Sequence, residues 1–118
     1  MLKIKVQELS LEKFRKYGDY ASLTDDSFRP EGPGRSNEFY PDRLQIFFAQ
    51  TTPTSVSICR VAKGENIISM VEYHQYTCEG LLPIDGDCVI FVGPSGRNVD
   101  PNTIEAFHVP QGTYVKLN

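Results

Sequence analysis

The sequence predicts one mainly β domain with a single short helix near the N-terminus. The chain has 118 residues, which is close to the commonest size of one domain. Its composition, 40% hydrophobic and 23% charged, is that of a globular protein rather than a disordered one. Runs rich in Val, Ile, Phe and Thr follow one another in the second half, separated by short turn-forming clusters. Short strands at this spacing are typical of a sandwich or barrel, so we expect residues 1–118 to form a single domain.

The N-terminal residues have the pattern of a half-buried strand followed by the helix. Residues 2–9 alternate apolar and polar side chains, which predicts a strand with one buried face. The apolar positions, which we expect to face the core, are Leu2, Ile4 and Val6. Ser10 is a favourable N-cap residue, and Leu11 and Phe14 follow it at helical spacing. Gly18 predicts the end of this helix.

Seven further strands are predicted after a long loop rich in Pro and Gly at 25–36. They are expected at 44–50, 55–62, 67–74, 79–83, 87–92, 103–108 and 113–117. The Phe47–Phe48 pair and the VIFV run at 89–92 are interpreted as sheet core. The connections include KGEN, DGD and PQG, which favour turns.

Charge and hydropathy exclude several classes of function. The net charge of -3 leaves no basic surface for nucleic acid. No apolar run is long enough to cross a bilayer and no secretory leader is evident, so we expect a cytoplasmic protein that does not enter membranes. The three cysteines are dispersed in apolar runs, which favours reduced core thiols over a disulfide framework or a zinc site. They are Cys59, Cys78 and Cys88.

Three polar side chains form the candidate site. Glu72 and His74 are two residues apart and would share one face of a strand, while Glu79 begins the next strand. A carboxylate and an imidazole side by side on such a face can hold a divalent metal ion or act as an acid and base pair. The alternative is a surface histidine beside two solvated glutamates.

The spacing of these residues resembles the first cupin motif, His-x-His, three or four residues, Glu, six residues, Gly. Here Glu72 takes the place of the first histidine, His74 and Glu79 match the next two positions, and Gly86 matches the last. The resemblance implies a cupin-like β-barrel, also called a double-stranded β-helix or jelly roll.

Several short elements, in order along the chain, resemble the ureidoglycolate lyase family, formerly ureidoglycolate hydrolases. They are ELSLEKFRKYGDY, FYPD at 39–42, VSICR ending at Arg60, and VEYHQYTCEGLLPI at 71–84. Family members have Gln or Ser near the place of Glu79 and continue past the last strand into a His-rich segment. This chain ends at Asn118 and has no Trp. Either the sequence is a shortened form, or the other half of the site is made differently, for example by a partner subunit.

The resemblance implies a lyase that releases urea and glyoxylate from ureidoglycolate, a step of allantoin degradation, or a relative that acts on another small carboxylate. It would assign His74 or Glu72 to proton transfer or to a divalent metal ion, Glu79 to the same cluster, and Arg60 to the substrate carboxylate. It also implies a homodimer. The alternative function is a non-catalytic cupin-like module for binding or assembly.

Other candidate residues have structural alternatives. Arg60 can instead pair with a surface acid, and Tyr40 and Asp42 can close the long loop instead of lining a pocket. His108 lies in an alternating strand, where it can join the site or face solvent. The GPSGR sequence at 93–97 lacks the strand-to-helix context of a phosphate-binding loop.

Overall fold

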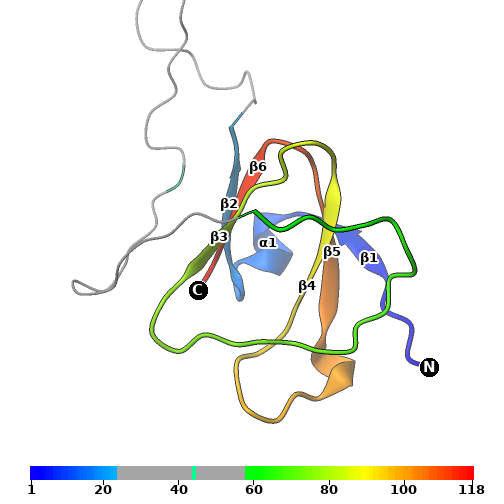
Figure 1. The fold of residues 1–118 in the computed structure, drawn as a ribbon. Coiled ribbons are helices and arrows are strands. Elements are labelled where there is room, and N and C mark those ends of the chain that lie inside the picture. Colours follow the sequence, from blue (N-terminus) through cyan, green and yellow to red (C-terminus); the bar gives the residue numbers. More distant parts are fainter. Residues whose placement is uncertain (24–43, 45–57) are drawn as a thin grey trace, which may run out of the picture.

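Two three-stranded sheets make up most of the regular structure (Figure 1). The structure is a computed structural model that describes residues 1–23, 44 and 58–118. Sheet A contains, in spatial order, β1 (Val6–Glu8), β5 (Glu105–Val109) and β4 (Cys88–Val92). Sheet B contains β2 (Gly18–Ser22), β6 (Thr113–Leu117) and β3 (Glu79–Leu81). The mainly β prediction is confirmed, and the described strands do not close into a barrel.

Among the described residues, one α-helix forms; it begins where the sequence predicts but ends at Phe14, before the end predicted at Gly18. This helix, α1 (Leu11–Phe14), is capped by Ser10, whose hydroxyl accepts a hydrogen bond from the backbone N–H of Lys13 at 3.4 Å. Phe14 is fully buried, and its ring lies edge-on to that of Phe107 in sheet A, with centroids 5.2 Å apart. The centroid of the Phe14 ring also lies 6.2 Å from that of Tyr20 in sheet B. One phenylalanine of α1 therefore joins the two sheets in a common core.

The rest of the core comes from alternate positions of β5 and β6. Phe107 and Val109 of β5 and Val115 of β6 are buried beside Phe14. Since side chains in a strand alternate between its two faces, these positions give each sheet one apolar inner face. The prediction for the last strand, 113–117, is confirmed at both ends.

The strand β2 was not predicted, because Gly18 was expected only to end the helix and residues 18–22 contain no Val, Ile, Phe or Thr. It runs antiparallel to β6, with Gly18 opposite Leu117. A Cβ atom at Gly18 would lie 1.8 Å from the carbonyl oxygen of Lys116. Glycine is required here because the backbone of β6 passes so close, rather than because a helix must end.

The first strand is shorter than predicted and shows its other face to the core. Only Val6–Glu8 pair with β5, in parallel. Val6 is 43% exposed, and the half-buried position is Gln7, whose amide donates to Glu105 at 3.2 Å. The expectation that Leu2 and Val6 face the core is therefore wrong, because a hydrogen bond to β5 holds the polar residue on the inner face.

Residues 58–78 form an irregular segment, so the strand predicted at 67–74 is wrong, as is the 58–62 part of the strand predicted at 55–62. In Figure 1 this segment makes a wide loop before it enters β3. A strand needs a backbone partner, and among the described residues no other strand pairs with this segment. Its apolar side chains are consequently exposed, Val61 by 85% and Met70 by 80%.

Residues before β5 form a short 3-10 helix, η1 (Pro101–Thr103), which delays the start of the predicted strand. Asp100 caps it by accepting from the backbone N–H of Asn102 at 2.9 Å. The PQG turn after β5 is confirmed, and Gly112 adopts a positive φ of 74° there.

Several sequence predictions fall outside the described residues. They concern the loop at 25–36, most of the strand at 44–50, Phe47–Phe48, and the candidates Tyr40 and Asp42. In the described ranges, no helix has the length and apolarity needed to cross a bilayer. Cys59 is exposed rather than a core residue, whereas Cys78 and Cys88 are half-buried.

Candidate metal centre

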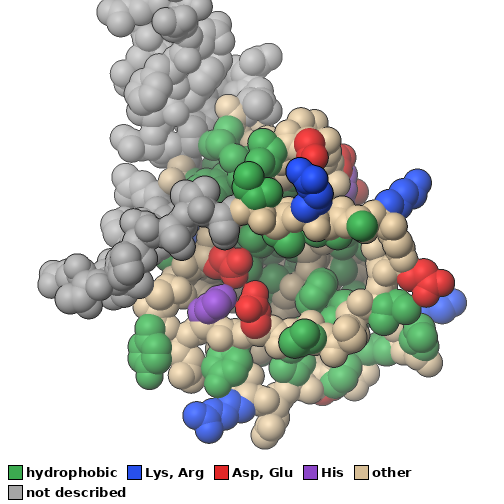
Figure 2. Space-filling view, in the orientation of Figure 1, with side chains coloured by type: hydrophobic (Ala, Val, Ile, Leu, Met, Phe, Trp, Pro, Cys, Tyr) green, Lys and Arg blue, Asp and Glu red, His purple; other side chains and the backbone are tan. Residues whose placement is uncertain are grey.

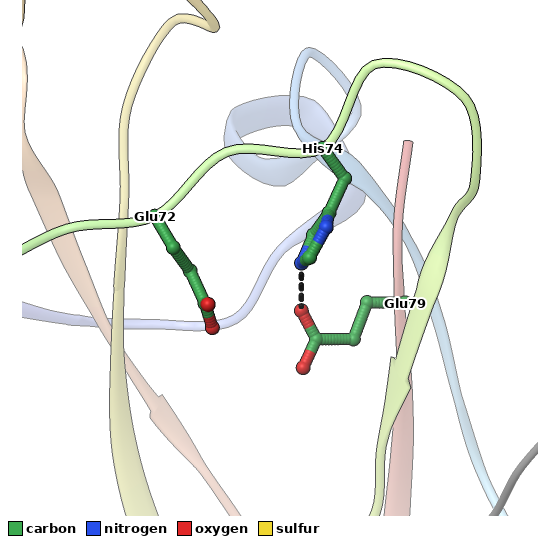
Figure 3. Close-up of side chains that lie close together, drawn as sticks. All are labelled: Glu72, His74 and Glu79. Atoms are coloured by element: carbon green, nitrogen blue, oxygen red, sulfur yellow. Dashed lines mark ion pairs between the residues drawn. The ribbon is translucent and has the colours of Figure 1, made fainter.

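The structure brings Glu72, His74 and Glu79 together although two of them do not lie in a strand. Glu72 and His74 project to the same side of the irregular segment, and Glu79 projects toward them from the start of β3 (Figure 3). Glu79 is fixed by the pairing of β3 with β6, in which it lies opposite Leu117. The site therefore has one carboxylate anchored in a sheet and two ligands on a less regular segment.

The ligand atoms of these three residues all lie within 4.8 Å of one another. The imidazole Nε2 of His74 is 3.4 Å from Oε2 of Glu79, as the dashed line in Figure 3 shows. The side chains of this pair are 45% and 39% exposed. In the space-filling view, a histidine with acidic side chains beside it lies open on the face toward the reader (Figure 2).

These distances fit a divalent metal ion. In a tetrahedral site with metal–ligand bonds of about 2.1 Å, neighbouring ligand atoms are about 3.4 Å apart. The His74–Glu79 contact has this length already, and rotation of the exposed Glu72 side chain would close the remaining gap. One imidazole and two carboxylates suit Zn²⁺, Mn²⁺ or Fe²⁺, and three protein ligands leave a position open for water or a substrate.

Two other residues of the predicted site have weaker structural support. Arg60 is exposed in the irregular segment, and no ion pair joins it to the three ligands in the described part of the chain. Gly86 lies in the bend between β3 and β4, where an added Cβ would meet nothing within 4 Å. Unlike Gly18, this last position of the motif therefore has no steric need for glycine.

His108 belongs to a different cluster. Its Nδ1 lies 3.0 Å from Oε2 of Glu8, and its Nε2 lies 2.9 Å from Oδ2 of Asp87. Both ring nitrogens are thus engaged by carboxylates, and neither is free to join the metal centre. Of the two alternatives for His108, the structure does not place it in the metal centre: the side chain is 32% exposed and bridges Glu8 of β1 and Asp87, which precedes β4.

A further polar cluster surrounds Glu105 and was missed at the level of sequence. Its carboxylate accepts hydrogen bonds from Gln7 and from the hydroxyl of Tyr17, and it pairs with Lys16. The Lys16 and Tyr17 contacts hold the pKa of Glu105 below its usual range, while burial raises the pKa of the Tyr17 phenol. Glu105 is two residues from the buried Phe107 and so points to the inner face, the signal that could have revealed this cluster.

This second cluster borders a shallow hollow of about 580 Å³, yet it does not have the properties of a catalytic site. Three donors engage the carboxylate of Glu105, and the Lys16 and Tyr17 contacts that lower its pKa favour the ionised form. The raised pKa of Tyr17 keeps the phenol protonated. We therefore interpret this cluster as a structural tie between α1, β1 and β5.

No family model, curated protein or solved structure matches this chain. The similarity to ureidoglycolate lyases therefore remains a prediction from short motifs, and the functional argument depends on the geometry of the metal centre.

Proposed function

We propose that Glu72, His74 and Glu79 bind a divalent metal ion and that this centre acts on a small carboxylate, with ureidoglycolate as the first substrate to test. The observation that supports the proposal is the approach of the three ligand sets to within 4.8 Å of one another. It is notable because Glu72 and His74 come from an irregular segment, where no sheet register forces them toward Glu79.

The partly open position of the centre supports access by a small molecule. The residues are exposed or half-buried, and Figure 2 shows the surface hollowed beside them, with hydrophobic side chains in the hollow. A bound divalent ion would act there as a Lewis acid toward an oxygen of the substrate. Three protein ligands would leave room for that oxygen.

The chain's own carboxylates can carry the proton that this reaction moves. Ureidoglycolate has a hydroxyl group and a ureido nitrogen on one carbon. A carboxylate that ligates through one oxygen keeps a second oxygen free, and for Glu72 this oxygen would accept the hydroxyl proton. The O–H electron pair then forms the carbonyl of glyoxylate, the C–N bond breaks, and the same proton passes to the departing nitrogen to give urea.

Arg60 is the proposed anchor of the substrate carboxylate. Its guanidinium is exposed, has no carboxylate partner among the described residues, and offers a planar fork that matches a carboxylate. If it has this role, Arg60→Gln should raise KM at least about tenfold while kcat changes less, because the lost contact binds substrate and transition state alike.

The experiment is release of urea and glyoxylate from ureidoglycolate by the purified chain, with Zn²⁺, Mn²⁺ or Fe²⁺ added in turn. Glu72→Gln should reduce turnover by about 100-fold or more, the range of a lost general base. Glu65→Gln, which changes an exposed acid in the same irregular segment, should leave turnover unchanged. Absence of turnover with all three metals would overturn the enzymatic proposal.

A non-catalytic binding module is the second candidate, and the exposure of the site favours it. Catalytic centres usually exclude water, whereas the side chain of His74 is 45% exposed. This alternative predicts that the chain binds a divalent metal ion as the enzymatic proposal does, but that it does not turn over ureidoglycolate. Metal titration and the urea assay together therefore separate the two functions.

We also propose that sheets A and B are parts of a cupin-like barrel, that the protein forms a homodimer, and that it is cytoplasmic. The shared core of Phe14, Phe107 and Val115 supports the first, since it packs two antiparallel-rich sheets face to face. The edge position of β1 supports the second, since an exposed edge strand favours pairing with another chain. Light scattering of the purified chain tests the dimer.

A further inference from the structure

His108, in β5, contacts residues from two neighbouring parts of the chain: β1 and the residue that precedes β4. It lies in β5, the central strand, and it faces Glu8 of β1 directly in the strand register. Its two ring nitrogens are 3.0 Å from the Glu8 carboxylate and 2.9 Å from that of Asp87, which precedes β4. One ring thus ties the edge strand β1, and the residue that precedes the other edge strand β4, to the central strand.

Asp87 extends this connection to the turn between β5 and β6. Its second carboxylate oxygen accepts a hydrogen bond from the backbone N–H of Gln111 at 2.8 Å. The side-chain amide of Gln111 in turn donates to the carbonyl oxygen of Ile84 at 2.7 Å. The hydrogen bonds of Asp87 therefore link the imidazole to the turn between β5 and β6 and, through Gln111, back to Ile84 in the connection between β3 and β4.

The charges around His108 come from two acids on its neighbouring elements. Hydrogen bonds to Glu8 first, and then to Asp87, raise the pKa of His108 above its ordinary value. On β4, the residue opposite His108 is the uncharged Val89. The backbone N–H of Gln111, followed by His108, lowers the pKa of Asp87. Within the described part of the chain, no other charged group acts on the pKa of His108.

We propose that His108 is a pH-operated clasp, whose doubly protonated ring fastens β1 and the start of β4 to β5. The imidazolium donates from both nitrogens, one to each carboxylate. A neutral imidazole carries a single N–H. Its other nitrogen would then present a lone pair to an ionised carboxylate, which has no proton to donate, so no hydrogen bond forms there. Loss of the proton therefore removes one of the two ties and loosens an edge of sheet A. This inference does not depend on the proposed function.

The sign of the effect follows from the direction of each shift. Because the pKa of His108 is raised on folding, its contribution to stability is complete below the unfolded value of about 6.5 and is lost as the pH rises through the folded value. Because the pKa of Asp87 is lowered, its contribution is complete above about pH 4 and is lost as the pH falls. The clasp should be strongest between about pH 4 and 6.5.

NMR titration tests the electrostatic part, because the chain has two histidines. The imidazole resonance that disappears in His108→Gln belongs to His108. We expect it to titrate at a higher pH than an exposed histidine, and at a lower pH in Glu8→Gln than in the unsubstituted chain. A His108 resonance that titrates at or below the ordinary value would overturn the proposal.

Thermal unfolding between pH 6 and 8.5, in the presence of a chelator, tests whether deprotonation of His108 lowers the stability of the fold. The unsubstituted chain should lose stability over this range, and His108→Gln should lose much less because the titrating ring is gone. Glu12→Gln, which changes an exposed acid of α1, should keep the pH dependence of the unsubstituted chain. Identical pH profiles for the unsubstituted chain and His108→Gln would contradict the clasp.

Discussion

The core around Phe14 and Phe107 and the irregular segment at 58–78 are opposite in their physical character. In the core, apolar side chains are buried between paired strands, and single positions decide how the sheets pack. In the segment, no described residue forms a strand and apolar side chains face outward. Two of the three proposed ligands, Glu72 and His74, nevertheless lie in this segment. Stability and the candidate chemistry are thus located in different parts of the molecule.

The largest expected difference between the two regions is in the free energy of unfolding. Phe107→Ala should reduce it by about 3–5 kcal/mol, since truncation removes a fully buried ring and leaves a cavity. Met70→Ala in the segment should change it by less than about 0.5 kcal/mol, because that side chain is exposed. Denaturant unfolding measures both. Similar losses for the two variants would show that the segment packs as tightly as the core.

Two glycines give the next comparison. Gly18→Ala should reduce stability by about 1–3 kcal/mol, because the new Cβ would collide with the backbone of β6. Gly86→Ala, where the added methyl meets nothing within 4 Å, should change stability by less than about 0.5 kcal/mol. A larger effect at Gly86 than at Gly18 would contradict the described pairing of β2 with β6 and restore the importance of the motif glycine.

The smallest expected difference between two variants concerns the cap of α1. Ser10→Ala should cost about 1 kcal/mol, because the hydroxyl satisfies one backbone N–H of a helix that has only four residues. Ser10→Asp keeps a capping oxygen and should restore most of this loss. Thermal unfolding of the two variants measures the difference. Equal stability of Ser10→Ala and the unsubstituted chain would mean that packing of Phe14 alone holds the helix.

The sequence predicted elements best where local pattern and tertiary contact agree. Ser10, the PQG turn and the strand at 113–117 combine capping, turn chemistry and alternation with pairing, and each is confirmed. The strand at 67–74 was wrong because a run of β-forming residues favours an extended chain but does not supply a partner strand. In β1, a hydrogen bond from Gln7 outweighed the apolar pattern.

The sequence predicted the three residues of the candidate site, but not the backbone structure that holds two of them. The three ligands were expected to converge from adjacent strands, yet only Glu79 lies in a strand. The spacing of Glu72 and His74 still places both side chains on one side of the chain (Figure 3). The tie around Glu105 and the bridge at His108 were not predicted because their partners lie between 21 and 100 residues away in sequence, separations at which periodicity carries no information.

The most direct test of the central claim is calorimetric titration of the purified chain with Zn²⁺ and Mn²⁺, beside His74→Ala and the exposed-acid control Glu65→Gln. The account predicts one ion per chain, an affinity at least about tenfold weaker in His74→Ala, and an unchanged affinity in Glu65→Gln. Binding that is absent, or equally strong in all three proteins, would contradict the assignment of Glu72, His74 and Glu79 as a metal centre.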